Sequence, residues 1–432
     1  MICQNFTAIF PFLALLTCYS LLVASLPIIA LKFKRAQILT QCIDNMLNSS
    51  RSNILQIKGI KNGMFTEYLE QLIPFHLKFE ISTIGNFYGF LKNLNKLQYE
   101  KYYPHADLVP KFGINQTSEL IDNFKGKIAI YKNAFANEYG EFVIDNYIIR
   151  PPYDSGSNFV RRYGNGPVVF KCEKACVFGH YLMYNFGHFI HDYLSPLMLI
   201  PSDFLEDCVV ILSEKTRKFG DDVLKAVGIV RYIYLSDHEW VYARRLAVAV
   251  EGRPHLMHFG VPIQKLVDHL KIYFRTLEIK PTRYVIMNRE LKDRRHINNF
   301  QDLFIAVKMN IKDVRFEVLE DRVGSIESYA KFYPTIKCIF LPTGSNAVKT
   351  IFMHPNSVVI IASNEMFDFA VVYSILSVHI KVIYFIHLYN HFDSFNVDIN
   401  LSIQAIKVGV NASITGCFPN PIPNISFIDF IH

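Results

Sequence analysis

The chain has 432 residues, a length that suggests two or three domains, and 51% of them are hydrophobic, which is ample for sizeable cores. Its formal net charge of +7 is modest and suits anionic small ligands or a membrane surface as well as nucleic acid. Because no dense block of Lys and Arg is present, we expect no nucleic-acid partner.

A long apolar segment lies near the N-terminus. Phe6 to Leu31 carries no charge over about 26 residues, which is long enough to cross a bilayer. A cleaved secretory signal is the alternative, but the run is too long for one and nothing basic precedes it. We therefore predict an uncleaved single-pass transmembrane helix. The basic residues Lys32, Lys34 and Arg35 that follow it, taken alone, would place the rest of the chain in the cytoplasm.

Sequons and cysteines favour the opposite orientation. Six of the eight cysteines lie beyond the apolar segment and permit lumenal disulfides, although the sequence does not specify their pairing. Triplets of the form N-x-[ST] begin at Asn48, Asn115, Asn400, Asn411 and Asn424. We expect a type II membrane protein of the endoplasmic reticulum or Golgi lumen.

Beyond the apolar segment, strand patterns begin at about residue 126 and are followed by alternating strand and helix patterns. Short Ile/Val-rich strands between helices of about ten to fifteen residues indicate a parallel α/β sheet. Pro281, after a long predicted helix, marks a boundary. The expected regions are 1–35 (transmembrane anchor and flanks), 36–125 (stem and accessory region of short helices and loops), 126–280 and 281–390 (two Rossmann-like domains), and 391–432 (a Pro-rich tail).

The predicted elements of the two Rossmann-like regions follow from their apolar runs. In the first region the strands are 127–136, 141–150, 166–172, 208–213 and 231–235, and the helices are 185–200, 217–227 and 262–277. In the second region the strands are 283–289, 314–320, 338–342, 357–363 and 381–386, and the helices are 299–309, 325–333 and one from about 346.

Two histidines and an aspartate fall within five positions of the predicted helix 185–200. His188 and Asp192 are i,i+4 neighbours and His188 and His191 are i,i+3 neighbours, so the three side chains share a face. A carboxylate beside an imidazole fixes its tautomer and supports a general base near neutral pH. A purely structural polar face remains open, as does a zinc site completed by His180.

A basic loop follows the predicted strand 283–289. It contains Arg289, Arg294, Arg295 and His296. Ligands bind at the carboxyl ends of parallel strands in open α/β sheets, and guanidinium groups grip phosphate oxygens. A solvated basic loop is the alternative.

A turn of small residues follows the predicted strand 338–342. Thr343, Gly344, Ser345 and Asn346 precede a helix, so their backbone N–H groups are suited to a phosphate. The turn lacks the spacing of a Walker loop, and an ordinary N-capping turn explains it equally well.

In order and spacing these motifs resemble glycosyltransferase family 61. The first signature is matched by Asn185, His188, Asp192 and Pro196, the second by Arg289 and the step Arg295-His296-Ile297-Asn298, and the third by "PTGSNAVKTIFMHP" (342–355). A tail "FNVDI" (395–399) also matches. Family members usually carry His-Gly-Ala in the third turn, where this chain has Thr343-Gly344-Ser345.

The resemblance implies a GT-B fold with an acceptor-side and a donor-side domain facing a cleft. It implies an inverting transferase that moves a sugar from a nucleotide-sugar donor, expected to be a UDP-sugar, to a glycan or glycoprotein acceptor, without a metal or other cofactor. His188, His191 and Asp192 would be catalytic, and Arg289, Arg294, Arg295 and residues 343–346 would bind the donor. An inactive relative that acts as a binding or scaffold protein is the alternative, because the third-turn His is missing.

Overall fold

The computed structural model of the protein describes residues 54–76, 87–91, 125–150, 166–179, 182–251, 260–320, 324–364, 368–387 and 392–418. The predicted transmembrane helix, Phe6 to Leu31, lies outside these residues. Within them, no helix has both the length and the hydrophobicity that a membrane crossing requires.

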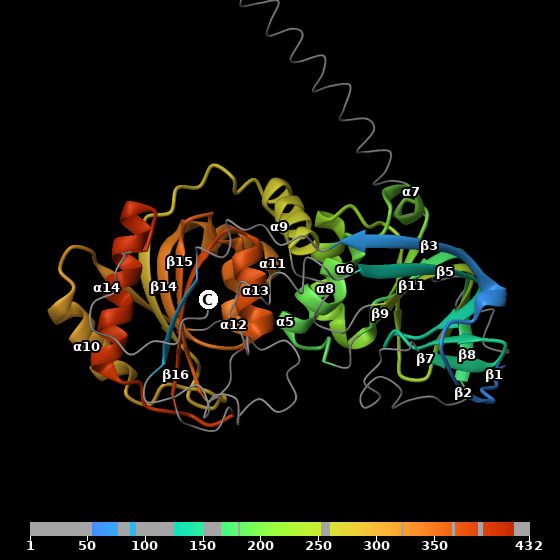
Figure 1. Ribbon diagram of the computed structural model, residues 1–432, viewed down its shortest axis with the longest axis horizontal. Coiled ribbons are helices and arrows are strands. Elements are labelled where there is room, and N and C mark those ends of the chain that lie inside the picture. Colours follow the sequence, from blue (N-terminus) through green and yellow to red (C-terminus); the bar gives the residue numbers. More distant parts are fainter. Residues whose placement is uncertain are drawn as a thin grey trace, which may run out of the picture.

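The first lobe is built on a ten-stranded sheet (Figure 1). Its strands are β1 (Ile54–Leu55), β2 (Gly59–Asn62), β3 (Leu69–His76), β5 (Lys125–Ala136), β6 (Phe142–Ile144), β7 (Tyr147–Arg150), β8 (Gly166–Cys176), β9 (Val209–Ser213), β10 (Tyr232–Leu235) and β11 (Trp240–Glu251). Strands β8 to β11 pair in parallel, as the alternation of strands and helices predicts. Strands β5, β6 and β7, which lie before this alternation, add antiparallel pairs to the same sheet.

A tight turn accounts for part of this antiparallel edge. Asp145 and Asn146 join β6 to β7 with φ angles of 50° and 63°. Two-residue hairpin turns need positive φ at both positions, which Asn and Asp tolerate best among side-chain-bearing residues. The hairpin therefore forms locally and adds antiparallel strands to the parallel core of the sheet.

The second lobe is a parallel sheet with the order β13-β12-β14-β15-β16-β4. Its strands are β12 (Arg283–Asn288), β13 (Phe316–Glu320), β14 (Ile336–Pro342), β15 (Val358–Ser363), β16 (Lys381–Ile386) and β4 (Phe87–Leu91). All five strands predicted between 281 and 390 are confirmed. The chain reverses its direction of strand addition between β12 and β14, which is the switch point where open α/β sheets bind ligands.

Helices cover both faces of the second sheet (Figure 1). α10 (Phe300–Asn310) and α14 (Ile399–Thr415) pack together on one face. α11 (Ile326–Phe332), α12 (Ser345–Val348) and α13 (Phe369–Ser377) lie on the other face. α14 comes from the predicted tail. In region 36–125, expected to hold short helices and loops, the described residues include loops and the short helix η1 (Thr66–Tyr68), but also strands β1 to β4, which were not expected.

One apolar core connects the two lobes. Buried side chains from both sheets belong to it, and between them lie α5 (Phe186–His188), α6 (Ser195–Leu197), α8 (Arg217–Ala226) and α9 (Val261–Tyr273). At the junction the Phe186 ring meets the Tyr329 ring edge-on at 5.3 Å between centroids. We therefore describe two lobes joined by a shared core, and the cleft expected between them stays a prediction.

Lys271 of α9 is buried in this junction, which gives the fold a measurable pH dependence. Its Nζ donates a 2.7 Å hydrogen bond to the Met353 carbonyl. Burial lowers the pKa of this ammonium group from 10.5 to about 8, and Asp268 offsets part of the effect. Between these pH values the unfolded chain binds more protons than the folded chain. The free energy of unfolding should therefore rise with pH across this window, by roughly 3 kcal/mol for this group.

We predict that Lys271→Met removes this rise, as measured by urea unfolding at several pH values between about 7.5 and 10. Lys265→Met is the matched control, because Lys265 lies on the same helix with an exposed side chain. It should keep the wild-type slope. An unchanged slope in Lys271→Met would contradict the assignment.

Candidate functional site

The predicted helix 185–200 is confirmed, but its middle turn is wider than an α-helix. α5 continues into a π-helix, Phe189–Leu194, which is followed by α6. Pro196 has no N–H and cannot donate to the Asp192 carbonyl four residues earlier, so an α-helical ladder cannot continue through this turn. Such π-turns inside helices occur frequently at functional sites.

The three predicted catalytic side chains lie together on this turn. His188 Nδ1 lies 2.6 Å from Asp192 Oδ2, and His191 Nδ1 lies 3.0 Å from Asp192 Oδ1. The side chains of Asp192 and His191 are 2% and 4% exposed, whereas that of His188 is 25% exposed. With the His188 Nδ1–H donating to the carboxylate, Nε2 is the nitrogen that can take a proton from a substrate.

The same three residues fit the geometry of a metal site. Their candidate ligand atoms lie within 4.8 Å of one another. However, the Nδ1 atoms of both imidazoles face the Asp192 carboxylate, which is also the arrangement of an acid–base pair. His180, the further ligand of the zinc hypothesis, lies outside the described residues. Metal independence therefore stays a prediction.

The basic loop after β12 is closed by one buried amide. Asn288 Oδ1 accepts hydrogen bonds from the backbone N–H groups of Arg289 and Ile297, both at 2.9 Å, and its Nδ2 donates to the Ile297 carbonyl at 3.0 Å. His296 Nδ1 lies 2.7 Å from the Arg289 carbonyl. Asn288 thus holds the two ends of the loop together, which brings Arg289 near Arg295.

The tail motif fixes this loop from outside. The Phe395 N–H donates to the His296 carbonyl at 2.9 Å, and the Asn298 N–H donates to the Phe395 carbonyl at 2.8 Å. Asn299 exchanges two further 2.9 Å bonds with the backbone of Val397. The motifs around 295–298 and 395–399 are therefore physically paired, which the sequence alone did not predict.

Arg289 and Arg295 converge on Gly344. A Cβ added to Gly344 would lie 2.6 Å from Arg289 Nη1 and 3.1 Å from Arg295 Nη2. Gly344 has φ 123° and ψ −163°, a region that is essentially restricted to glycine. The Thr343 carbonyl accepts a 3.4 Å hydrogen bond from Arg289 Nη1. We call Arg289, Arg295 and Gly344 the arginine cradle.

The cradle concentrates positive charge at the switch point between β12 and β14. Burial lowers the pKa of the Arg295 guanidinium, Arg289 lowers it further, and Asp368 raises it. Arg295 is half-buried, with φ 66°, although its loop position suggests exposure. Two guanidinium groups held together with little solvent are suited to a diphosphate.

Arg294 does not share this position. It is exposed, and its guanidinium lies over the Phe392 ring at 4.8 Å from the centroid. The backbone at Arg295 is left-handed (φ 66°), and the side chains of Arg294 and Arg295 point to different sides of the loop. A donor-binding role for Arg294 stays a prediction.

In the turn after Gly344, side chains are more important for ligand binding than the dipole of the following helix. Ser345 begins α12, which has only four residues and continues as a 3₁₀ turn, so the expected helix-end field is small. Asn346 is buried; its Oδ1 accepts from Lys349 Nζ at 3.3 Å, and its Nδ2 has no hydrogen-bond partner within the described residues. That amide N–H is a donor available to an oxygen-rich ligand.

The turn that carries His188 and Asp192 approaches the segment of the arginine cradle at Gly187. A Cβ on Gly187 would lie 3.6 Å from Ser345 Cα and 3.3 Å from Val348 Cγ2. Gly187 precedes His188, and Ser345 follows Gly344. The two groups of predicted residues therefore come together where the two lobes touch.

Sequence reasoning missed Asp368. Its Oδ2 accepts a 3.0 Å hydrogen bond from Thr343 Oγ1, and its N–H donates to the Tyr384 hydroxyl at 2.9 Å. An aspartate directly before a helix, after a strand at the ligand-binding edge, is the signal that would have identified it.

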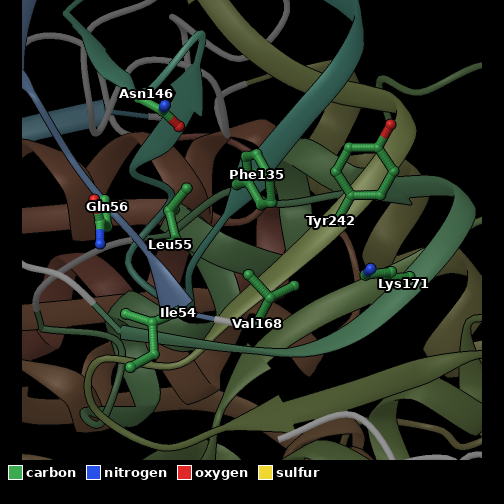
Figure 2. A pocket seen from close by; sticks show the side chains of 8 residues that line it. All are labelled: Ile54, Leu55, Gln56, Phe135, Asn146, Val168, Lys171 and Tyr242. Atoms are coloured by element: carbon green, nitrogen blue, oxygen red, sulfur yellow. The ribbon is translucent and has the colours of Figure 1, made fainter. Parts of the chain in front are cut away.

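A cavity of about 440 Å³ lies elsewhere, near the start of β8 (Figure 2). None of the predicted site residues lines it. Its lining residues are Ile54, Leu55, Gln56, Phe135, Asn146, Val168, Lys171 and Tyr242.

Comparison with protein families agrees with the motifs. Residues 186–360 match the family model described as Glycosyltransferase 61. This range contains the turn with His188, His191 and Asp192 as well as the arginine cradle. No curated protein matches the chain.

Gly344→Ala tests the cradle. The added methyl group would displace both guanidinium groups and strain the backbone, so we expect the affinity for inorganic pyrophosphate to fall at least about tenfold by calorimetry. Gly416→Ala is the control, because Gly416 has φ 84° and no atom within 4 Å of its Cβ position. It should cost about 1 kcal/mol of stability and leave pyrophosphate binding unchanged. Equal affinities in both variants would refute the cradle as an anion site.

Proposed function

We propose that this chain transfers a sugar from a nucleotide-sugar donor, expected to be a UDP-sugar, to a glycan or glycoprotein acceptor with inversion, and the match of residues 186–360 to the Glycosyltransferase 61 family model supports the proposal. The observation that carries this proposal is the contact between Gly187, the residue before His188, and Ser345, the residue after Gly344, because it brings the chain segments of the imidazole–carboxylate pair and of the arginine cradle together. A transferase needs both: a base for the acceptor and positive charge for the departing diphosphate.

On the acceptor side we assign the base to His188. Its Nε2 removes the proton from an acceptor hydroxyl while that oxygen forms a bond to the anomeric carbon. Asp192 is buried and hydrogen-bonded to Nδ1, so it orients the ring and stabilises the imidazolium that results. His191, on the other carboxylate oxygen, is a positioning residue.

On the donor side the bond between the anomeric carbon and the diphosphate oxygen breaks, and the electron pair leaves with the diphosphate. Arg289 and Arg295 stabilise this charge from fixed positions at the carboxyl ends of the strands. Thr343 stands where family members usually have a histidine, and unlike a histidine it cannot carry a positive charge. Its carbonyl accepts a hydrogen bond from Arg289 and helps to hold that side chain. The positive charge of the site therefore comes from the arginines.

We infer that the N-terminal apolar segment anchors the enzyme as a type II protein of the endoplasmic reticulum or Golgi, with the site in the lumen. Two of the sequons, at Asn400 and Asn411, fall on exposed positions of α14. Glycan attachment there, measured by a mobility shift after glycosidase treatment, would support lumenal orientation.

The proposed activity is tested with the purified full-length chain in detergent. It is incubated with UDP-sugars, with and without EDTA, and UDP release and sugar transfer are measured. We expect UDP release that EDTA does not abolish. Folded protein that binds UDP but neither transfers nor hydrolyses a donor would favour the inactive scaffold alternative.

His188→Ala should lower turnover by about 10²- to 10⁴-fold, because the acceptor hydroxyl loses its base. Asp192→Asn should lower it by about 10²-fold or more, since an amide does not hold the productive tautomer as firmly. Both should leave UDP affinity within about twofold of wild type. The control is His269→Ala on exposed α9 surface, which should keep full activity. Wild-type turnover in His188→Ala would overturn its assignment as the base.

A further inference from the structure

Asp368 occupies the N-cap of α13 but does not cap the helix. An aspartate at this position normally accepts a hydrogen bond from an N–H of the first helical turn. Asp398 does so at α14, where it accepts from the Leu401 N–H at 2.9 Å. The Asp368 side chain makes no such bond to α13. A favourable local interaction is therefore given up, and the carboxylate is directed elsewhere.

The carboxylate is directed toward the arginine cradle. Its Oδ2 accepts from the hydroxyl of Thr343, the residue next to Gly344. Its Oδ1 has no hydrogen-bond partner within the described residues, and Asp368 as a whole is half-buried. Its charge acts on the Arg295 guanidinium. The backbone is fixed by the bond to the buried Tyr384 hydroxyl.

A carboxylate beside an anion site narrows the class of ligand. It repels phosphate oxygens and has only acceptor atoms, so its open oxygen favours a ligand group that donates hydrogen bonds. Hydroxyl pairs on a ribose are bound in this way by acidic residues at the edges of other open α/β sheets. A ligand that satisfies both features carries a diphosphate for Arg289 and Arg295 and a diol next to it.

We propose that Asp368 binds a vicinal diol of the donor beside the diphosphate, and that the diol is the ribose of a ribonucleoside diphosphate sugar. Thr343 positions the carboxylate by occupying Oδ2, which leaves Oδ1 for the ligand. This inference rests on the proposed function and makes it more specific. It also gives Thr343 a role, which is to hold the Asp368 carboxylate through its hydroxyl. A histidine at this position would hold the carboxylate differently, because its ring can carry a charge and a hydroxyl cannot.

The test measures binding of inorganic pyrophosphate, UDP and 2′-deoxy-UDP to the full-length chain by calorimetry. Wild type should bind UDP about tenfold or more tightly than 2′-deoxy-UDP, because loss of the 2′-hydroxyl breaks the diol and removes one hydrogen bond to the carboxylate. Asp368→Asn should lose most of this preference and bind UDP about tenfold more weakly. Its affinity for pyrophosphate should stay equal or increase, since a repelling charge has been removed.

Two further variants keep the result interpretable. Thr343→Val releases Oδ2 and should also reduce the preference for UDP, without weakening pyrophosphate binding. Asp302→Asn is the matched control: an exposed aspartate in the first turn of α10 is neutralised, and all three affinities should stay at wild-type values. Melting temperatures identify any variant that fails to fold.

Each outcome bears on the assignment. The assignment would be overturned if Asp368→Asn kept the wild-type preference for UDP over 2′-deoxy-UDP, or if it lost as much affinity for pyrophosphate as for UDP. Asp368 would then be only a structural link between α13 and the turn at Thr343. If Asp368→Asn binds UDP like wild type but binds a UDP-sugar, measured in the same way, more weakly, the ribose assignment is overturned and the diol belongs to the transferred sugar. Failure of the wild type to bind either UDP or pyrophosphate would instead refute the proposed function.

Discussion

The close approach of α5 to α12 at Gly187 is the constraint on which the site depends. Without a side chain at this position, the backbone before His188 comes to rest against Ser345 and Val348. A Cβ at this position would lie 3.3 Å from Val348 Cγ2 and 3.6 Å from Ser345 Cα, so alanine would need only a small shift of Val348, whereas a bulky side chain has no room between the two helices. Because the two residues in contact are immediate neighbours of His188 and Gly344, one packing contact sets the position of His188 relative to the arginine cradle.

The cradle illustrates how a costly arrangement of charge is held in place. Two partly desolvated guanidinium groups repel each other. The fold holds them together by fixing the backbone of the loop that carries them. Asn288 closes the loop, Phe395 pairs with its end, and Arg295 adopts a left-handed backbone. In the proposed reaction, positive groups fixed in advance would need no reorganisation as the diphosphate departs, which is usually a large contribution to catalysis.

Many of the strands and site residues could be predicted from the sequence, and the features that were not predicted have identifiable physical reasons. The five strands between 281 and 390 are mostly apolar runs, and all were found, whereas β4 was missed because it lies far away in the sequence, in the region expected to hold short helices and loops. β11, "WVYARRLAVAVE", was missed because Arg244 and Arg245 interrupt its apolar pattern although it lies centrally in its sheet. Sequence also could not separate Arg294 from Arg295, because a single positive φ decides which one faces Gly344. Asp368 was missed because its role depends on a contact with Thr343, 25 positions away.

The most direct test of a single composite site is a crystal structure of the protein with UDP bound. We predict that the diphosphate lies between Arg289 and Arg295 against Gly344, with its outer phosphate facing His188 Nε2. UDP bound in the cavity near the start of β8, or anywhere remote from Gly187, would contradict the account.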